Sequence, residues 1–231
     1  MESRRVLRQE RKFLISMSQY YRFDRQLSCL LQADPHNGPD GYTVRSLYFD
    51  TLADKDYYDK LAGVEYRRKM RLRIYSPDSP QALLEMKQKQ GSDQLKRSLA
   101  VSADDARRIA RGDYEPLLAY KDPFAAECYG VLHMNCYTPR VIVEYRRKAY
   151  VLPENDTRIT FDSRVRATTF TGDMFEGNPA FFPVLHPADV VLEVKYNHFL
   201  LAYVKEILRV SNNSETAVSK YALARGGRIS F

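Results

Sequence analysis

Charged side chains recur at every second residue in several segments of this 231-residue chain. The segment Lys69–Tyr75 is a clear case, because Lys69, Arg71 and Arg73 alternate with apolar residues. Successive side chains of a strand point to opposite faces of a sheet, so a period of two predicts a β-strand. The pattern therefore predicts a sheet with one apolar face and one densely charged face.

The same alternation predicts eight strands. These are Val6–Leu14, Thr43–Asp50, Lys69–Tyr75, Ala82–Gln88, Leu95–Val101, Arg140–Val151, Arg158–Arg166 and Asp189–Asn197. Helices are predicted between them, at Ser16–Gln32, Ala53–Leu61, Ala103–Gly112, Glu115–Met134 and Phe199–Val210. Ser16 is a suitable N-cap for the first helix, and Ser102 precedes the third, which has Asp105 in its first turn. Strands and interspersed helices indicate an α+β fold.

Composition favours one folded domain, residues 1–231, because no linker or low-complexity tract divides the chain. Cys29, Cys128 and Cys136 lack the spacing of a disulfide framework or a zinc site, and the four histidines form no metal-ligand motif. No apolar run approaches the length that spans a bilayer, and the N-terminus has no apolar signal core. We therefore expect a cytoplasmic protein.

The 36 Lys and Arg residues exceed the 29 Asp and Glu residues, which favours an anionic partner. Two arrangements would explain the charged strand faces. In the first, the sheet lies on helices and its charged face meets water. In the second, the charged face curls inward and lines the pore of a barrel of about eight strands, which is wide enough for side chains or one small ligand. Alternation alone leaves both arrangements open.

Short motifs follow one another along nearly the whole chain. They are RQERKF at 8–13, SLYFDT at 46–51, RLR at 71–73, LEMK at 84–87, EYRRKAY at 144–150, RITFD at 158–162, LEVK at 192–195 and SKY at 219–221. This succession resembles the VTC domain, the polyphosphate polymerase branch of the triphosphate tunnel metalloenzymes, within the CYTH-like superfamily. Each motif is weak alone, but their common order is specific.

The resemblance implies a closed eight-stranded antiparallel β-barrel with helices packed outside it. Its tunnel would bind a triphosphate together with a divalent metal, Mn²⁺ or Mg²⁺. The implied activity is transfer of the terminal phosphate of ATP to a polyphosphate chain.

The resemblance also assigns residues to roles. The phosphate-binding positions are Lys12, Arg71, Arg73, Lys87, Lys96, Arg147, Arg158, Lys195 and Lys220. Catalytic roles fall to Arg73, Lys195 and Lys220, and metal binding falls to Glu193 with Glu10 and Glu85 as supports. These residue types suit the chemistry, because Arg and Lys bind phosphate oxygens while carboxylates hold hard divalent cations.

The strand Arg140–Val151 carries charges on both faces. Glu144, Arg146 and Lys148 share one face, and Arg147 lies on the other. Periodicity does not decide which face points to the site, and only the resemblance selects Arg147.

The first strand departs from the superfamily pattern of two glutamates and a lysine, because Arg8 takes the place of the first glutamate before Glu10 and Lys12. This favours the polymerase branch over the triphosphatases. A hydrolase acting on triphosphate or polyphosphate and a non-catalytic polyphosphate- or nucleotide-binding module stay as alternatives. Nucleic-acid binding is not expected, because no RNA- or DNA-binding motif is present. Any attachment to a membrane would come from a partner protein.

Overall fold

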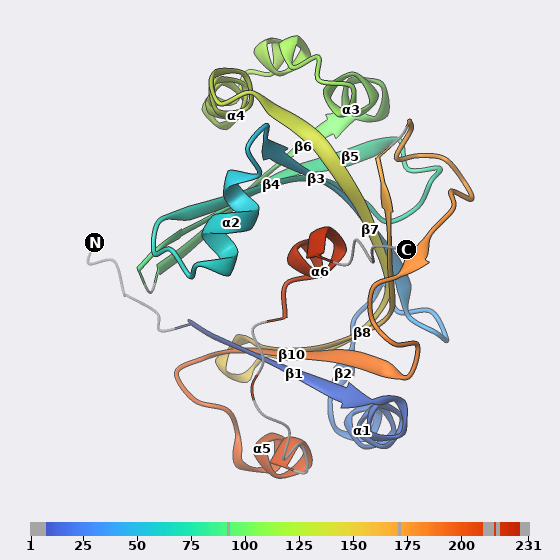
Figure 1. Cartoon of the computed structure of the whole chain (residues 1–231). Helices are drawn as coiled ribbons and strands as arrows, with labels where there is room; N and C mark the ends of the chain where they lie inside the picture. The colour runs from blue at the N-terminus through green and yellow to red at the C-terminus, as the bar shows by residue number, and fades with distance from the viewer. Residues whose placement is uncertain (1–7, 92, 171, 210–214, 216–217, 227–231) are drawn as a thin grey trace. The chain divides into compact units, whose positions relative to one another are not determined.

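The computed structural model describes residues 8–91, 93–170, 172–209, 215 and 218–226 (Figure 1). Within them, ten strands are formed: β1 Arg8–Ser16, β2 Gln32–Ala33, β3 Tyr42–Thr51, β4 Arg67–Ile74, β5 Gln81–Gln90, β6 Asp93–Ser102, β7 Tyr137–Leu152, β8 Thr157–Thr169, β9 Phe182–Pro183 and β10 Asp189–Asn197. The α-helices are α1 Met17–Leu30, α2 Lys55–Leu61, α3 Ala103–Ala110, α4 Pro123–Met134, α5 Ala202–Arg209 and α6 Lys220–Gly226. Short 3₁₀ helices are η1 Glu115–Ala119 and η2 Glu154–Asp156. Of the predicted elements, Val6, Leu7 and Val210 lie outside the described residues.

The strands form an antiparallel sheet in the order β1-β10-β8-β7-β3-β4-β5-β6, with β2 paired to β7 and β9 paired to β8. This confirms the α+β class and all eight predicted strands. The order is an open path from β1 to β6, and the described residues form no ladder between these two end strands. Hydrogen bonding therefore does not confirm the closed eight-stranded barrel that the resemblance implies.

Two compact units divide the chain. Unit 1 comprises residues 1–43, 145–165 and 185–219, and unit 2 comprises residues 44–144, 166–184 and 220–231. Strands β3, β7 and β8 contribute residues to both units. The single domain that the composition favours stays a prediction.

In unit 1, helices α1 and α5 cover the apolar face of the β1 and β10 strands (Figure 1). Phe23 and Leu27 of α1 are fully buried against a core that includes Phe161, Leu192 and Val204. Burial of such side chains is worth about 1.5–3 kcal/mol each, so this apolar face holds the helices in place. The charged side chains alternate with the core residues and lie on the opposite face of the strands.

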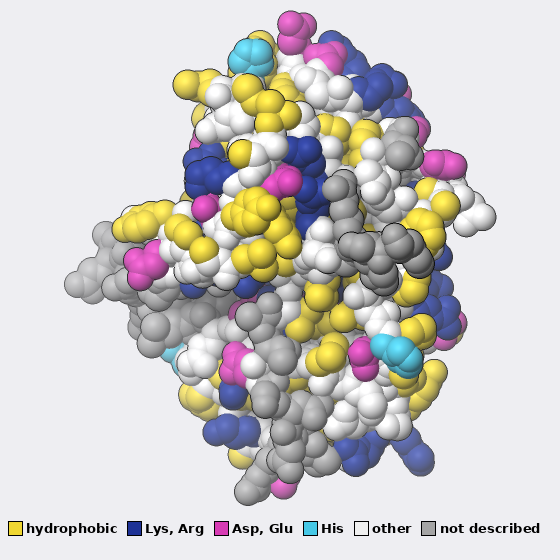
Figure 2. Space-filling model, in the orientation of Figure 1, with side chains coloured by type: hydrophobic (Ala, Val, Ile, Leu, Met, Phe, Trp, Pro, Cys, Tyr) yellow, Lys and Arg dark blue, Asp and Glu magenta, His cyan; other side chains and the backbone are white. Residues whose placement is uncertain are grey.

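In unit 2, helices α3 and α4 cover the apolar face of β4, β5 and β6 (Figure 1). Met70, Leu72, Leu84 and Met86 are fully buried there. Exposed hydrophobic side chains also gather over α2 (Figure 2), where Tyr58 is 60% exposed. In each unit, then, the apolar strand face lies under helices, as the sequence predicts.

Local signals explain where the helices begin. The Ser16 hydroxyl accepts a hydrogen bond from the Gln19 amide, and the Gln19 side chain accepts one from the Ser16 amide. This capping box confirms the predicted start of α1. Ser102 caps α3 in the same way, by accepting from the amide of Asp105.

The prediction of one helix over Glu115–Met134 is wrong, because the chain breaks between η1 and α4. Pro123 occupies the first turn of α4, and Asp122 caps it by accepting from the Phe124 amide at 2.8 Å. Proline lacks an amide hydrogen and fits the start of a helix better than its interior. None of the helices in the described residues is long and apolar enough to cross a membrane.

Candidate functional site

The charged face of unit 1 carries a group of interlocked side chains, here called the unit 1 cluster. Its members are Glu10, Lys12, Arg147, Asp162, Glu193 and Lys195. The register of β1 and β10 sets Lys12 opposite Glu193 and Glu10 opposite Lys195. Lys12 pairs with Glu10, and Lys195 pairs with Glu193 and lies 4.0 Å from Glu10. Alternating charge on neighbouring strands therefore brings these predicted residues together.

Glu193 is buried, with 6% of its surface exposed, yet it is held as a carboxylate. Burial by itself would raise its pKa, but Lys195, Lys12 and Arg147 hold the pKa well below its usual range. The pKa of Lys12 is raised in turn, because Glu193 and Glu10 outweigh the burial that would lower it. Glu193 and Lys12 are therefore both charged at neutral pH.

Arg147 lies in this cluster, and its neighbours on β7 do not. Its guanidinium donates two hydrogen bonds to the fully buried Asp162, at 2.7 and 2.8 Å. Burial would lower the pKa of Arg147, but Asp162 raises it well above its ordinary value. Arg146 instead donates to the Thr43 hydroxyl, and Lys148 donates to Asp24 of α1. Within unit 1, Arg147 therefore lies with the other charged residues of the cluster, and its phosphate-binding role stays a prediction.

Asp162 was not among the predicted site residues, although it ends the RITFD motif. It lies four residues after Arg158 on the same face of β8, which is the signal that could have identified it. Arg158 itself donates to Asp34 at 2.6 Å and is also within 3.3 Å of the Tyr42 hydroxyl. It is thus held at the edge of the cluster by Asp34, which follows β2, and by Tyr42, the first residue of β3.

The charged face of unit 2 carries a second group, the unit 2 cluster. Its members are Tyr48, Lys69, Arg71, Arg73, Glu85, Lys87 and Lys96. Glu85 is 2% exposed and lies 2.5 Å from Arg71, 3.6 Å from Arg73 and 2.5 Å from Lys96. A single carboxylate on β5 therefore holds three cations from the two flanking strands, β4 and β6.

The electrostatics of the unit 2 cluster are strongly positive. Burial would raise the pKa of Glu85, but Arg71, Arg73 and Lys96 lower it to about 2. Tyr48, which accepts a hydrogen bond from Arg71 at 3.1 Å, is affected in the same way. Burial would raise its pKa, but Arg71 and nearby cations lower it to about 8. The cations of the unit 2 cluster outnumber its one carboxylate, Glu85. The net positive charge of this face would therefore attract an anion.

Helix α6 brings Lys220 to unit 2. The sequence did not predict this helix, because Lys220 stands outside any regular pattern. The next residue, Tyr221, is fully buried, stacks on Tyr48 with ring centroids 5.1 Å apart, and donates to Asp50. Lys69 lies 5.4 Å from the centre of the Tyr221 ring. Tyr221 therefore fixes α6 to the face that carries the unit 2 cluster.

Replacing Tyr221 with Phe is expected to lower the free energy of unfolding by roughly 1.5–3 kcal/mol, the usual contribution of a hydrogen bond to a charged group. Asp50 would keep the amides of Thr51, Asp56 and Tyr57 as donors, so the loss stays moderate. Denaturant titration measures it. Tyr58→Phe, at an exposed ring of the same unit, is the control and should change little. An unaltered unfolding free energy for Tyr221→Phe would show that the hydroxyl does not anchor α6.

The predicted metal-binding residues fit a hard divalent cation in part. Glu10 and Glu193 lie on adjacent strands of unit 1, while Glu85 belongs to unit 2. Mg²⁺ is commonly held by one or two carboxylates, with water and substrate phosphates completing the shell. Two carboxylates therefore suffice chemically. The described residues contain no group of three or more acidic, His or Cys side chains arranged for a metal.

The predicted phosphate-binding residues thus separate into two sets. Unit 1 holds Lys12, Arg147, Arg158 and Lys195, and unit 2 holds Arg71, Arg73, Lys87, Lys96 and Lys220. The roles of all these residues stay predictions.

Comparison with known proteins adds four findings. The sequence matches the VTC domain family over residues 7–225. HpAC1 from Hippeastrum, a candidate adenylyl cyclase described as having a dominant triphosphatase activity, is similar in structure, with a TM-score of 0.56 and 16% identity over 94% of this chain and 95% of that one. A candidate adenylate cyclase from Bacillus halodurans has a TM-score of 0.51 and 15% identity over 91% and 92% of the two chains. None of the curated proteins matches the sequence.

Proposed function

The chain belongs to the VTC domain family of the triphosphate tunnel superfamily, and on this premise we propose that it is an ATP-dependent polyphosphate polymerase. It would transfer the terminal phosphate of ATP to a growing polyphosphate chain. The observation that supports this most directly is the unit 2 cluster, where cations from β4 and β6 surround one buried carboxylate. Such a face suits a ligand with many negative charges.

The cations bind and orient the phosphate chain. Arg71 and Arg73 offer planar guanidinium groups that can donate two hydrogen bonds to one phosphate. Lys12, Lys195 and Lys220 act as point charges. Phosphoryl transfer depends mainly on positioning and on neutralising charge on the transferring group. We assign the catalytic roles to Arg73, Lys195 and Lys220, which would contact the transferred phosphate.

The proposal includes the closed tunnel. In such a tunnel, cations from several strands would surround the phosphate chain. Water would be partly excluded there, and each charge would count for more than at an open surface.

A divalent cation, Mn²⁺ or Mg²⁺, belongs to the proposal, with Glu193 and Glu10 as its protein ligands and Glu85 as a further support. When bound, it would offset negative charge on the terminal phosphoryl group. Glu193 is suited to this role because its neighbours hold it ionised.

A triphosphatase is the second candidate, favoured by the fold that the chain shares with HpAC1. The same cations would bind triphosphate, and water would be the acceptor in place of a phosphate chain. A binding module without turnover is the third candidate.

Incubation with ATP and Mn²⁺, followed by gel separation of products and measurement of released phosphate, distinguishes the three candidates. We expect long phosphate chains and ADP, as a polymerase requires. Release of free phosphate without formation of chains would instead show that the protein is a triphosphatase. Triphosphate binding without turnover of any kind would leave only the binding module.

A further inference from the structure

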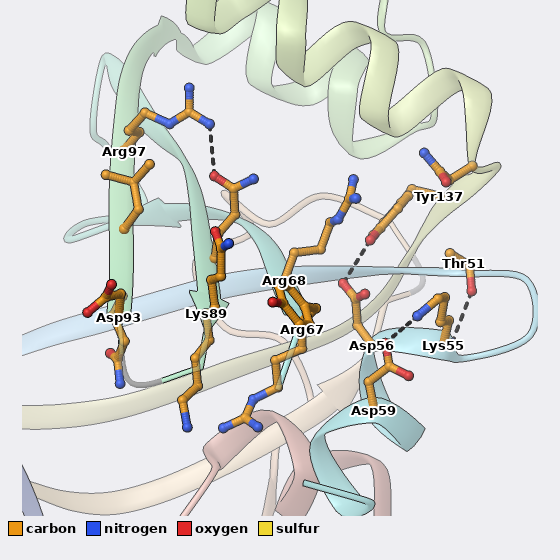
Figure 3. A pocket seen from close by; sticks show the side chains of 16 residues that line it. Thr51, Lys55, Asp56, Asp59, Arg67, Arg68, Lys89, Asp93, Arg97 and Tyr137 are labelled. Atoms are coloured by element: carbon orange, nitrogen blue, oxygen red, sulfur yellow. Dashed lines mark hydrogen bonds and ion pairs between the residues drawn. The ribbon is translucent and has the colours of Figure 1, made fainter. Parts of the chain in front are cut away.

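The charged face of unit 2 extends beyond the unit 2 cluster, toward the end of the β4–β5 ladder. The strand register places Arg67 opposite Lys89, two residues further along each strand than the pair Lys69 and Lys87. Figure 3 shows the Arg67 and Lys89 side chains pointing in the same direction, while Arg68 points to the other side. Arg67 and Lys89 thus form a pair of like charges on the same face as Arg71.

No carboxylate compensates this pair among the residues that the structure describes. The Arg67 side chain donates to the backbone carbonyl of Val64 at 2.8 Å, and the Lys89 side chain has neither a hydrogen bond nor an ion pair in that part of the chain. Like charges directly opposite each other on adjacent strands destabilise a sheet. An arrangement of this kind is favourable when an anion binds between the two cations.

The pocket around the pair leaves room for such an anion. It has a volume of about 600 Å³, and both Arg67 and Lys89 line it. Its acidic residues are Asp56, Asp59 and Asp93, and each has a partner of its own. Asp56 accepts from the Tyr137 hydroxyl, Asp59 pairs with Lys55, and Asp93 also has an interaction of its own. They therefore do not serve as partners for the two cations.

Spacing along the strand indicates the length of the anion. Arg67 precedes Arg71 by four residues, which corresponds to about 13 Å along a strand. A triphosphate bound at Arg71 and Arg73 has only three phosphorus centres and ends before this distance is covered. A longer phosphate chain would pass Lys69 and Lys87 and reach the outer pair.

We propose that Arg67 and Lys89 form a distal phosphate subsite, which binds units of a long polyphosphate chain beyond those held at Arg71 and Arg73. This inference rests on the proposed function, because it assumes that phosphate chains bind to the charged face. It adds that the protein distinguishes ligands by chain length. Long polyphosphate would bind more tightly than triphosphate because only the longer chain reaches Arg67 and Lys89.

The test compares Arg67→Gln/Lys89→Gln with a matched control, Arg111→Gln/Lys121→Gln. The control removes the same charge from the same unit, but Arg111 and Lys121 are exposed and lie outside the pocket that the pair lines. Equilibrium binding is measured with triphosphate and with long-chain polyphosphate over a range of salt concentrations. Thermal unfolding of each variant shows whether it is folded.

We expect the Arg67→Gln/Lys89→Gln variant to lose long-chain affinity by roughly tenfold for each cation removed, with a much smaller loss for triphosphate. The salt dependence of long-chain binding should become shallower, because fewer cations contact the chain. The control should keep the wild-type preference for long chains.

Equal losses for both ligands, or equal effects of both variants, would overturn the distal subsite and leave the proposed function intact. So would a wild-type protein that binds triphosphate and long chains with the same affinity. A wild-type protein that binds neither ligand would instead contradict the proposed function, and the subsite with it.

Discussion

Replacing Glu85 with Gln is expected to lower the free energy of unfolding by about 3 kcal/mol at neutral pH. The carboxylate is 2% exposed and is the shared partner of Arg71, Arg73 and Lys96. Removing its charge leaves these cations close together without compensation. Triphosphate should at the same time bind more tightly than to the wild type, because its own charge replaces the one that was lost. Denaturant titration and equilibrium binding measure the two effects.

The pH dependence gives this prediction a second test. Because the folded-state pKa of Glu85 is lowered to about 2, its ionised form stabilises the fold. That contribution is complete above the pKa of a free glutamate, near 4.3, and is lost as the pH falls toward 2. The difference in unfolding free energy between the wild type and Glu85→Gln should therefore shrink as the pH falls through this range.

Glu127→Gln is the control, because Glu127 pairs with Arg97 on the other face of unit 2 and its side chain is 39% exposed. Exposed ion pairs contribute about 1 kcal/mol or less, so a small loss is expected. If Glu85→Gln is as stable as Glu127→Gln at neutral pH, Glu85 does not hold the cluster together. If it is less stable but binds triphosphate more weakly, the face does not bind phosphate in the way proposed.

The strands could be predicted from the sequence because each one has a buried face and a charged face. Residues such as Leu72 and Leu84 are fully buried, while their neighbours Arg71 and Glu85 belong to the cluster. Helix ends could be predicted where a capping residue marks them, as Ser16 does. The break at Pro123 carried a signal that the prediction of one long helix overlooked.

Other elements of the fold had no local sequence pattern from which they could be predicted. The strands β2 and β9 contain two residues each, which is too short for a pattern to show. Helix α6 spans only residues 220–226 and depends on Tyr221, whose burial and bond to Asp50 are tertiary contacts. Nothing in the sequence around Lys220 indicates that contact.

The charged residues of the site were predicted more completely than their partners. Alternation identified Glu85 and Glu193, but not that each carboxylate would face several cations. Asp162 was missed because one carboxylate at the end of an apolar motif is also typical of an ordinary strand end. Its bond to Arg147 depends on the pairing of two strands that the sequence does not specify.

Replacing Glu193 with Gln is expected to reduce turnover of ATP roughly 100-fold or more, while most of the triphosphate affinity survives. The amide keeps the shape of the side chain and removes the charge that a divalent cation needs. Lys195 and Lys12 would remain beside it, and Glu10 would still pair with Lys12. Phosphate binding through these cations should therefore continue, but the metal would lose its main protein ligand.

Two further variants make this result specific. Glu154→Gln, at an exposed position of η2 in the same unit, removes the same charge and should leave turnover unchanged. Arg73→Ala should weaken triphosphate binding itself, because Arg73 is one of the proposed phosphate-binding residues. Turnover at several Mn²⁺ concentrations and triphosphate affinity are measured side by side for all three variants. Near-normal activity of Glu193→Gln at every Mn²⁺ concentration would remove Glu193 as the metal ligand, because neither its charge nor a metal bound there could then be needed for phosphate transfer.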